Sequence, residues 1–371
     1  MPGRTRARRR PTRDRALRGG GALTAGANPA PGGATEIATQ NGRLPARLPR
    51  VDLCGVRLAG PVLNGSGTFD AIAAWRAFGD ELVERFPFHA FVSKTITLAP
   101  RSGNPPPRLW ETAAGLLNSI GLPNKGLEDF LAEDLPVLAR LPVPLVVSVL
   151  GFDHAELAEL VGRVGARPEV ALIELNFSCP NVKTGLEMGA EPSEAARSVE
   201  RVRPLTDVPL VVKLSPTAAD PAAVAAAVEA AGADAVSLIN TLRGAALDPR
   251  TRRPWLGGRT GGLSGPAVRS VALAQVAGVA RRVSVPVVGM GGVASGAHAA
   301  DLLAAGATAV AVGTESFRDP RAGGRISEEL AELLAHCDFS SWPGASSPPS
   351  LARKHLQTGC KPLTNTRRMQ G

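Results

Sequence analysis

Eight short runs of apolar, often β-branched residues alternate along the chain with longer alanine- and leucine-rich segments. Runs that are apolar at nearly every position are typical of strands buried on both faces, as in a parallel sheet whose strands are connected by helices. The predicted strands are 61–64, 90–94, 144–149, 171–176, 210–214, 235–239, 286–290 and 307–312.

Amphipathic segments follow most of these strands, and eight strand–helix units in one chain predict an α/β fold, specifically a (β/α)8 TIM barrel. Asp220, Ser264 and Ser295 lie just before three of the expected helices, as residues near a helix start do. A doubly wound open sheet is the structural alternative, but no G-x-G-x-x-G motif follows the first strand. Residues 51–60 are expected to form a short hairpin that closes the barrel's N-terminal end. The expected helices are 71–85, 126–140, 154–165, 192–203, 221–232, 265–282, 296–305 and 322–336.

The charge of the chain is concentrated in its ends. Residues 1–50 hold eleven arginines and two acidic residues, residues 341–371 hold five basic residues and no acidic one, and the net charge of +9 therefore leaves 51–340 at −5. We expect three parts: a disordered Arg/Gly/Pro-rich tail (1–50), the barrel (51–340) and an irregular C-terminal tail (341–371). The first tail is read as a plain solvated extension, with a transit-peptide-like segment or a tether to an anionic surface as alternatives.

Composition also excludes several classes of protein. With the basic residues in the tails, the isoelectric point of 10.2 does not indicate a nucleic-acid groove in the fold. No run of about 18 apolar residues is present, so no membrane span is expected, and we expect a cytoplasmic protein. None of the four cysteines has the C-x-x-C spacing of a zinc or dithiol site, and no metal site is predicted.

Glycines follow the last two predicted strands, at Gly291, Gly292 and Gly313. Chemistry in such barrels lies at the C-terminal ends of the strands, and glycines after strands seven and eight let backbone N–H groups approach a phosphate. Tight turns also use glycine, but its presence after both strands predicts a phosphate-bearing ligand.

Two lysines stand at strand ends in a chain that otherwise prefers arginine. Outside the C-terminal tail, lysine occurs only at Lys94, Lys125, Lys183 and Lys213, and the first and last of these end predicted strands. A lysine ammonium there suits an anionic flavin ring or a substrate carboxylate.

Cys179 lies in a polar loop between two asparagines, where a thiolate could act as a base. A nucleophilic cysteine would need a histidine nearby, and the five histidines fall on strand starts, helices or a tail. Cys54 and Cys337 are expected to be inert buried residues. Asparagines clustered in the same loops suit a planar ring with imide and carboxylate groups, namely Asn118, Asn176, Asn181 and Asn240.

These loops carry the segments SKT (93–95), PRSGNPPPRLWETAAGLLNSIGLPN (100–124), ELNFSCPNVKTG (174–185), VKLSP (212–216), INTLRG (239–244), GGLSGPA (261–267), GMGGV (289–293) and AVGT (311–314). With them, the chain from 51 to 320 resembles the dihydroorotate dehydrogenases, and among these the class 1B flavoprotein subunit.

The resemblance implies bound FMN, with contacts from Ser66, Lys94, Thr95, Ser148, Asn176, Lys213, Ile239, Gly265, Gly291, Gly292, Gly313 and Thr314. It implies that dihydroorotate is held by Lys94, Asn118, Ser119, Ile120, Gly121, Leu122, Asn176, Asn181, Asn240 and Thr241.

The resemblance also implies that Cys179 removes the C5 proton of dihydroorotate while C6 gives hydride to flavin N5, and that Lys213 stabilises the reduced ring. The product is orotate, in pyrimidine biosynthesis. Electrons then pass to NAD through a partner subunit with FAD and an iron–sulfur cluster, in a heterotetramer built on a homodimer core.

The sequence departs from this class at two places. Ser148 stands where this class usually has an asparagine, and the tail after Asp338 does not resemble the family's C-terminal helix. Four alternative functions are a fumarate-using class 1A enzyme, a related pyrimidine-reducing flavoprotein, a non-catalytic barrel that serves as a scaffold subunit, and a flavin-free phosphate-binding isomerase.

Overall fold

The computed structural model describes residues 48–177 and 189–336 of the chain. An eight-stranded parallel sheet in the order β3-β14-β13-β10-β9-β8-β7-β4 forms the centre, and the predicted (β/α)8 barrel is confirmed. Each strand lies inside its predicted range: β3 (Val62–Asn64), β4 (Phe91–Val92), β7 (Leu145–Val149), β8 (Leu172–Asn176), β9 (Leu210–Lys213), β10 (Ala235–Leu238), β13 (Val287–Met290) and β14 (Ala309–Val312).

The sheet strands are buried along their whole length, as their sequences predict. All five residues of β7 and all five of β8 are buried, and the two strands pair in parallel from Val146↔Leu172 to Val149↔Leu175. A strand with water on neither face has no need for polar alternation, which is why these segments read as continuous apolar runs.

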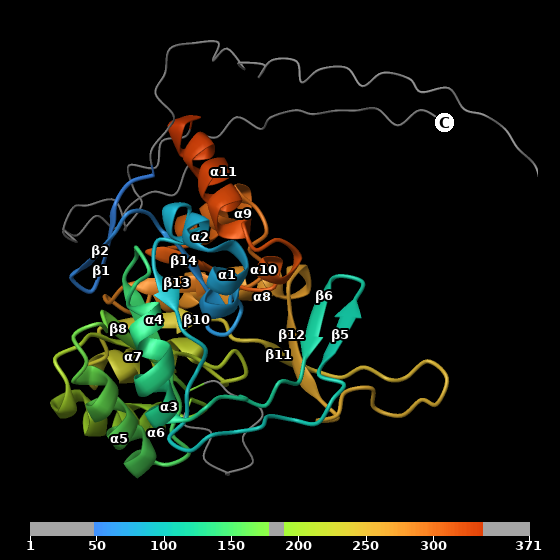
Figure 1. Cartoon of the computed structure of the whole chain (residues 1–371), viewed down its shortest axis with the longest axis horizontal. Coiled ribbons are helices and arrows are strands. Elements are labelled where there is room, and N and C mark those ends of the chain that lie inside the picture. Colours follow the sequence, from blue (N-terminus) through green and yellow to red (C-terminus); the bar gives the residue numbers. More distant parts are fainter. Residues whose placement is uncertain (1–47, 178–188, 337–371) are drawn as a thin grey trace, which may run out of the picture. The chain divides into compact units, whose positions relative to one another are not determined.

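Helices cover the sheet (Figure 1). Their bounds are α1 (Ala71–Phe78), α2 (Asp80–Glu84), α3 (Leu127–Asp129), α4 (Leu135–Leu138), α5 (His154–Gly165), α6 (Pro192–Val202), α7 (Pro221–Ala230), α8 (Arg269–Ala280), α9 (Gly296–Ala304), α10 (Glu315–Arg318) and α11 (Ala322–His336). A π-helical turn, η1 (Phe130–Asp134), joins α3 to α4, and two 3₁₀ turns, η2 (Arg203–Leu205) and η3 (Pro266–Val268), follow α6 and precede α8.

Two predicted helix starts are capped as expected and one is not. Asp220 accepts hydrogen bonds from the N–H groups of Ala222 and Ala223, and Ser295 accepts one from His298. Ser264 ends a strand instead, and its hydroxyl donates to the carbonyl of Leu116. The predicted helix start is nevertheless confirmed, because η3 begins at Pro266 and continues into α8, with Gly265 at the N-cap position and no side-chain cap.

Two long helices predicted from periodicity are interrupted. The expected helix 71–85 divides at Gly79, whose φ of 59° ends α1. The expected helix 126–140 contains the π-helical turn η1.

A second, antiparallel sheet was not predicted. It has the order β11-β12-β6-β5 and combines β5 (Leu109–Thr112) and β6 (Gly115–Asn118) with β11 (Leu242–Gly244) and β12 (Gly261–Ser264). The rings of Trp110 and Trp255 pack edge to face on it, with centroids 4.8 Å apart. This four-stranded sheet stands beside the barrel in Figure 1.

The predicted N-terminal hairpin is present as β1 (Val51–Leu53) and β2 (Val56–Leu58). Its two turn residues, Cys54 and Gly55, both have positive φ, as a tight hairpin turn requires. The Cys54 thiol donates to the carbonyl of Asp234, just before β10, so the hairpin covers the N-terminal end of the barrel. Burial raises the pKa of Cys54 to about 12, in agreement with its expected inertness.

Asn64 closes the barrel between the first and last strands of the sheet order, β3 and β4. Its fully buried side chain accepts a hydrogen bond from the N–H of Val92 and donates one to the carbonyl of the same residue, both 2.8 Å long. One backbone bond, from His89 N–H to the Val62 carbonyl, adds to this seam. A side-chain amide thus takes the place of a longer ladder between two short strands.

We expect Asn64→Leu to lower the free energy of unfolding by about 2–5 kcal/mol, because it leaves the buried N–H and C=O of Val92 without partners. Urea denaturation measures the loss. As a control, Thr308→Val removes one long contact to the Val287 N–H (3.4 Å) and is expected to cost less than about 1.5 kcal/mol. Equal losses in the two variants would contradict the role given to Asn64.

Candidate functional site

A cavity of about 290 Å³ opens at the C-terminal ends of the barrel strands. Loops after the strands form its floor and one wall, and the four-stranded sheet supplies the other wall through Leu109, Leu116, Asn118 and Ser264. This is the end of the barrel at which ligands are expected, and the volume is close to that of small-molecule sites.

Most of the predicted site residues line this one cavity: Ser66, Lys94, Thr95, Asn118, Ile120, Gly121, Leu122, Asn176, Lys213, Ile239, Asn240, Thr241, Gly265, Gly291, Gly292, Gly313 and Thr314. Ser119 and Ser148 do not line it and are fully buried behind its wall. Cys179 and Asn181 lie outside the described residues.

The glycine loops form a cradle of backbone amides. Gly292 has a φ of 69°, a conformation that favours glycine, and a Cβ there would meet Arg269 at 2.9 Å. Gly313 has open space instead, since a Cβ would touch only the Thr68 methyl at 3.7 Å. Among the described residues, no backbone hydrogen bond engages the amides of Gly291, Gly292, Gly313 or Thr314. Such a set of donors fits a phosphate group.

The cradle is tied to the four-stranded sheet through a pair of hydroxyls. Thr314 donates to Ser264 over 2.8 Å, and Ser264 in turn donates to the Leu116 carbonyl. The second sheet, which the sequence analysis did not predict, therefore helps to position the glycine loop after β14 at this end of the cavity.

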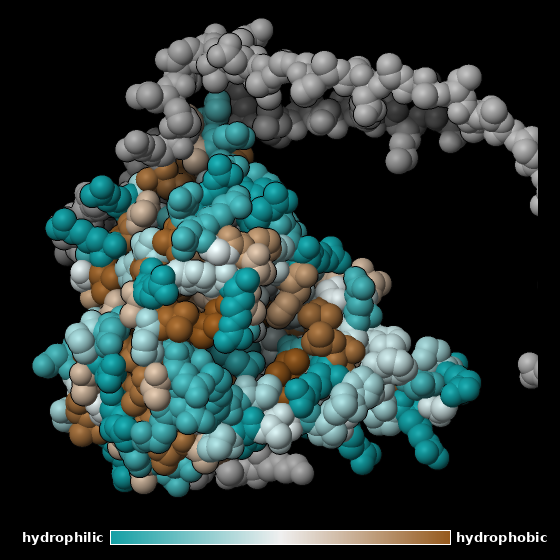
Figure 2. All heavy atoms as spheres, viewed as in Figure 1, coloured by the Kyte–Doolittle hydropathy of each residue, from teal (hydrophilic) through white to brown (hydrophobic). Residues whose placement is uncertain are grey.

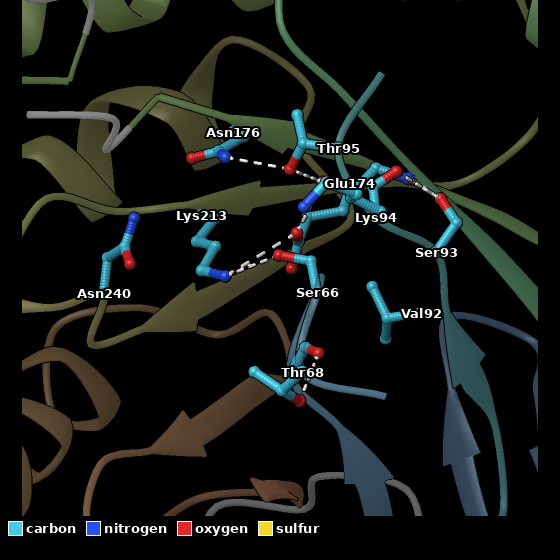
Figure 3. Close-up of polar contacts among 12 residues, drawn as sticks. Ser66, Thr68, Val92, Ser93, Lys94, Thr95, Glu174, Asn176, Lys213 and Asn240 are labelled. Carbon is cyan, nitrogen blue, oxygen red and sulfur yellow. Dashed lines mark hydrogen bonds and ion pairs between the residues drawn. The ribbon is translucent and has the colours of Figure 1, made fainter. Parts of the chain in front are cut away.

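Lys213 lies in the cavity floor at the end of β9. Its ammonium donates to the hydroxyl of Ser66 over 2.9 Å and lies 3.8 Å from the carboxylate of Glu174. Both charged side chains are about 95% buried (6% and 5% exposed), so the pair interacts in a poorly hydrated environment. Figure 3 shows Lys213 pointing toward Ser66 and Glu174.

Glu174 was not singled out from the sequence. Its carboxylate accepts a hydrogen bond from Ser148 (2.8 Å), Ser148 contacts Thr95 (2.9 Å), and Thr95 accepts one from the side-chain amide of Asn176 (3.1 Å). The available signal was an acidic residue inside the apolar run LIELN, two positions before Asn176 and hence on the same face of the strand.

Lys94 stands on the opposite side of the cavity floor, after β4. Lys94 is exposed at the mouth of the cavity, yet partial desolvation by the surrounding protein lowers the pKa of its ammonium. Asp70 opposes the shift and Arg108 adds to it. A partly dehydrated cation at this position favours an anionic ligand group.

The asparagines are held by backbone groups. Asn118 donates to the carbonyl of Gly262 over 3.2 Å, and the Asn240 oxygen accepts from the Thr241 N–H over 2.8 Å. With Asn176, they bring three of the four predicted asparagines to one cavity.

Apolar side chains complete the cavity wall, including Leu116, Leu122, Val268 and Met290. Leu109 and Phe317 also line the cavity, although they are 50% and 59% exposed. Figure 2 shows hydrophobic residues gathered where the four-stranded sheet meets the barrel. A site with amide donors at one end, a buried cation in the floor and apolar walls suits a planar, phosphate-bearing ligand.

Comparison with known proteins agrees with this chemistry. The family model described as dihydroorotate dehydrogenase matches residues 49–334. A relative from Pelobacter propionicus, named dihydroorotate dehydrogenase B (NAD(+)), catalytic subunit, is 47% identical over 285 residues, which is 76% of this chain and 92% of the relative. Relatives of the same name from Trichlorobacter lovleyi and Geobacter sulfurreducens are each 45% identical, covering 80% and 77% of this chain and 97% and 92% of their own.

A solved structure shares the fold. It is the crystal structure of DHODH in complex with ferulenol from Eimeria tenella, which aligns with a TM-score of 0.65 over 81% of this chain and 87% of that chain, at 23% identity.

Proposed function

The chain belongs to the dihydroorotate dehydrogenase family, and we propose that it uses FMN in the cavity of its barrel to oxidise dihydroorotate to orotate in pyrimidine biosynthesis. The reaction makes it an oxidoreductase that acts on a CH–CH group. The observation that carries the FMN assignment is the amide cradle after β13 and β14 in the same cavity as the buried Lys213 ammonium.

The cavity residues fit the chemical groups of FMN. The amides of Gly291, Gly292, Gly313 and Thr314 would hold its phosphate, because no backbone group in the described part of the chain accepts from these donors. Bound FMN would supply an electron-accepting ring. Lys213 would stabilise negative charge on that ring, and the apolar walls and Ile239 would exclude water from it.

The pyrimidine would lie against the other side of the cavity. Lys94 offers an ammonium for a carboxylate, and Asn118, Asn176 and Asn240 offer amides that can donate to and accept from an imide. The same segments of the sequence carry the other residues that we propose hold the pyrimidine: Ser119, Ile120, Gly121, Leu122, Asn181 and Thr241. Ser119 would support the segment from behind, because it is fully buried.

Cys179 is the proposed base. It comes three residues after Asn176, the last residue of β8, in the sequence. Its thiolate would take a proton from the substrate while hydride leaves from the neighbouring carbon. A cysteine thiolate is a suitable base at neutral pH when nearby cations lower its pKa.

The acceptor of the electrons is proposed from the relatives. Their name specifies NAD(+) and a catalytic subunit, which favours class 1B over the fumarate-using class 1A and over a non-catalytic scaffold. We propose a partner subunit that carries FAD and an iron–sulfur cluster, in a heterotetramer around a homodimer. A cytoplasmic location belongs to this proposal. Over the described ranges, every helix is too short or too polar to cross a membrane.

Cys179→Ala is expected to slow reduction of the bound flavin by dihydroorotate at least about a hundredfold, because it removes the base. The measurement is anaerobic mixing of purified, FMN-loaded protein with dihydroorotate while flavin absorbance is recorded. Cys54→Ala is the control cysteine and should keep the wild-type rate, since Cys54 lies in the hairpin below the barrel. Wild-type flavin that stays oxidised would overturn the substrate assignment.

Gly313→Ala is expected to weaken FMN binding at least about tenfold without unfolding the protein. The new methyl group would meet little protein but would occupy the space through which a phosphate approaches the amides, at the cost of a charge-assisted hydrogen bond. Gly324→Ala in α11, where a Cβ also has open space, should leave binding unchanged and stabilise the helix slightly. FMN titration and thermal unfolding measure both effects, and unchanged FMN affinity in Gly313→Ala would contradict the phosphate site.

A further inference from the structure

We propose that Glu174 is a positioning residue, one buried carboxylate that compensates the flavin-side cation Lys213 and at the same time orients the pyrimidine-side amide of Asn176 through Ser148 and Thr95. The inference rests on the proposed function, since it assigns flavin and pyrimidine to this cavity. Glu174 itself does not line the cavity. It would therefore act through its neighbours and not by touching a ligand.

Lys213 and Glu174 form a buried pair of opposite charges. Lys213 and Glu174 face each other across 3.8 Å with both side chains almost fully buried. The hydrogen bond of the ammonium goes to Ser66, not to Glu174. The carboxylate therefore offsets the lysine charge without capturing its donors, which leaves the ammonium directed at the cavity. A unit charge at this distance in a poorly hydrated site has a large effect on any nearby change of charge.

Three hydrogen bonds link the Glu174 carboxylate to the Asn176 amide, and the carboxylate determines their direction. An ionised carboxylate only accepts, so Ser148 donates to Glu174. Ser148 has no second proton and therefore accepts from Thr95, and Thr95 accepts from the Asn176 side-chain nitrogen. The negative charge thus determines which group donates in each of these three hydrogen bonds. It turns the nitrogen of the Asn176 amide toward Thr95, as Figure 3 shows.

The register of the barrel makes this arrangement possible. Ser148 on β7 is in register with Glu174 on β8, and Asn176 on β8 is in register with Lys213 on β9. Asn176 and Lys213, which lie at the two ends of this series of polar contacts, are therefore at the same level of the barrel mouth. Ser148 stands where class 1B enzymes usually have an asparagine. It links the Glu174 carboxylate to Thr95.

The test uses the FMN-loaded enzyme and two readouts besides activity: the equilibrium constant for flavin reduction, measured anaerobically against a reference dye, and orotate affinity, measured from the flavin spectrum. Glu174→Gln keeps the shape of the side chain but removes its charge. We expect flavin reduction to become more favourable by about tenfold or more, because Lys213 is no longer compensated. Orotate should bind about two- to tenfold more weakly, because an amide no longer dictates the donor direction.

Ser148→Ala separates the two roles. The substitution keeps the Glu174 carboxylate but removes the hydrogen bonds that link it to Thr95 and Asn176. We therefore expect weaker orotate binding, again about two- to tenfold, with less than about threefold change in the equilibrium constant for flavin reduction. Ser237→Ala is the matched control. Ser237 on β10 is in register with Lys213 and its hydroxyl is buried without a hydrogen-bond partner among the described residues, so both readouts should stay at wild-type values.

A wild-type flavin equilibrium in Glu174→Gln overturns the proposal, and so does a loss of orotate affinity in Ser237→Ala as large as in Ser148→Ala. If Glu174→Gln does not fold, Ser148→Ala alone decides: unchanged orotate affinity overturns the proposal. Wild-type protein that takes up neither FMN nor orotate overturns the proposed function and this inference with it. Wild-type binding with unaltered variants overturns the inference alone.

Discussion

Asn64 joins β3 to β4 through its side chain, and the rest of the molecule depends on that closure. β4 has only two residues and β3 only three, so a backbone ladder alone would hold the two ends of the sheet weakly. The buried Asn64 amide pairs with both the backbone N–H and the C=O of Val92. Without it, these two polar groups would lie in an apolar core without hydrogen-bond partners. The closed sheet then directs eight strand ends toward one mouth, where side chains far apart in sequence meet.

The polar side chains at the mouth of the barrel lie in two layers. An outer layer of glycine amides, asparagines, Thr95 and Lys94 faces the cavity, and an inner layer of Glu174 and Ser148 lies in the barrel below it. Buried polar groups of this kind are stable only when each finds a partner. The hydrogen bonds from Asn176 to Glu174 meet that condition and end beside the Lys213 ammonium.

Sequence reasoning succeeded where local patterns carry the information. The apolar runs located every barrel strand, and Asp220 and Ser295 marked helix starts because a capping side chain contacts its own first turn. It failed where partners are remote. The strands β6 and β12 have four residues each and begin with glycine. They lie about 150 residues apart in the chain and pair only in the folded protein, so their sequences did not predict strands.

The order of apolar and helical segments by itself determined the barrel, and the chemistry of the strand ends determined which residues gather at its mouth, because in a parallel barrel all strand ends point the same way. The same loops identified the family, and the ligand class is proposed from them. Tertiary structure alone decided how those residues are supported. That Asn64 closes the seam, that Ser148 lies behind Thr95, and that Glu174 faces both Ser148 and Lys213 depend on the register between strands, which no single segment of sequence encodes.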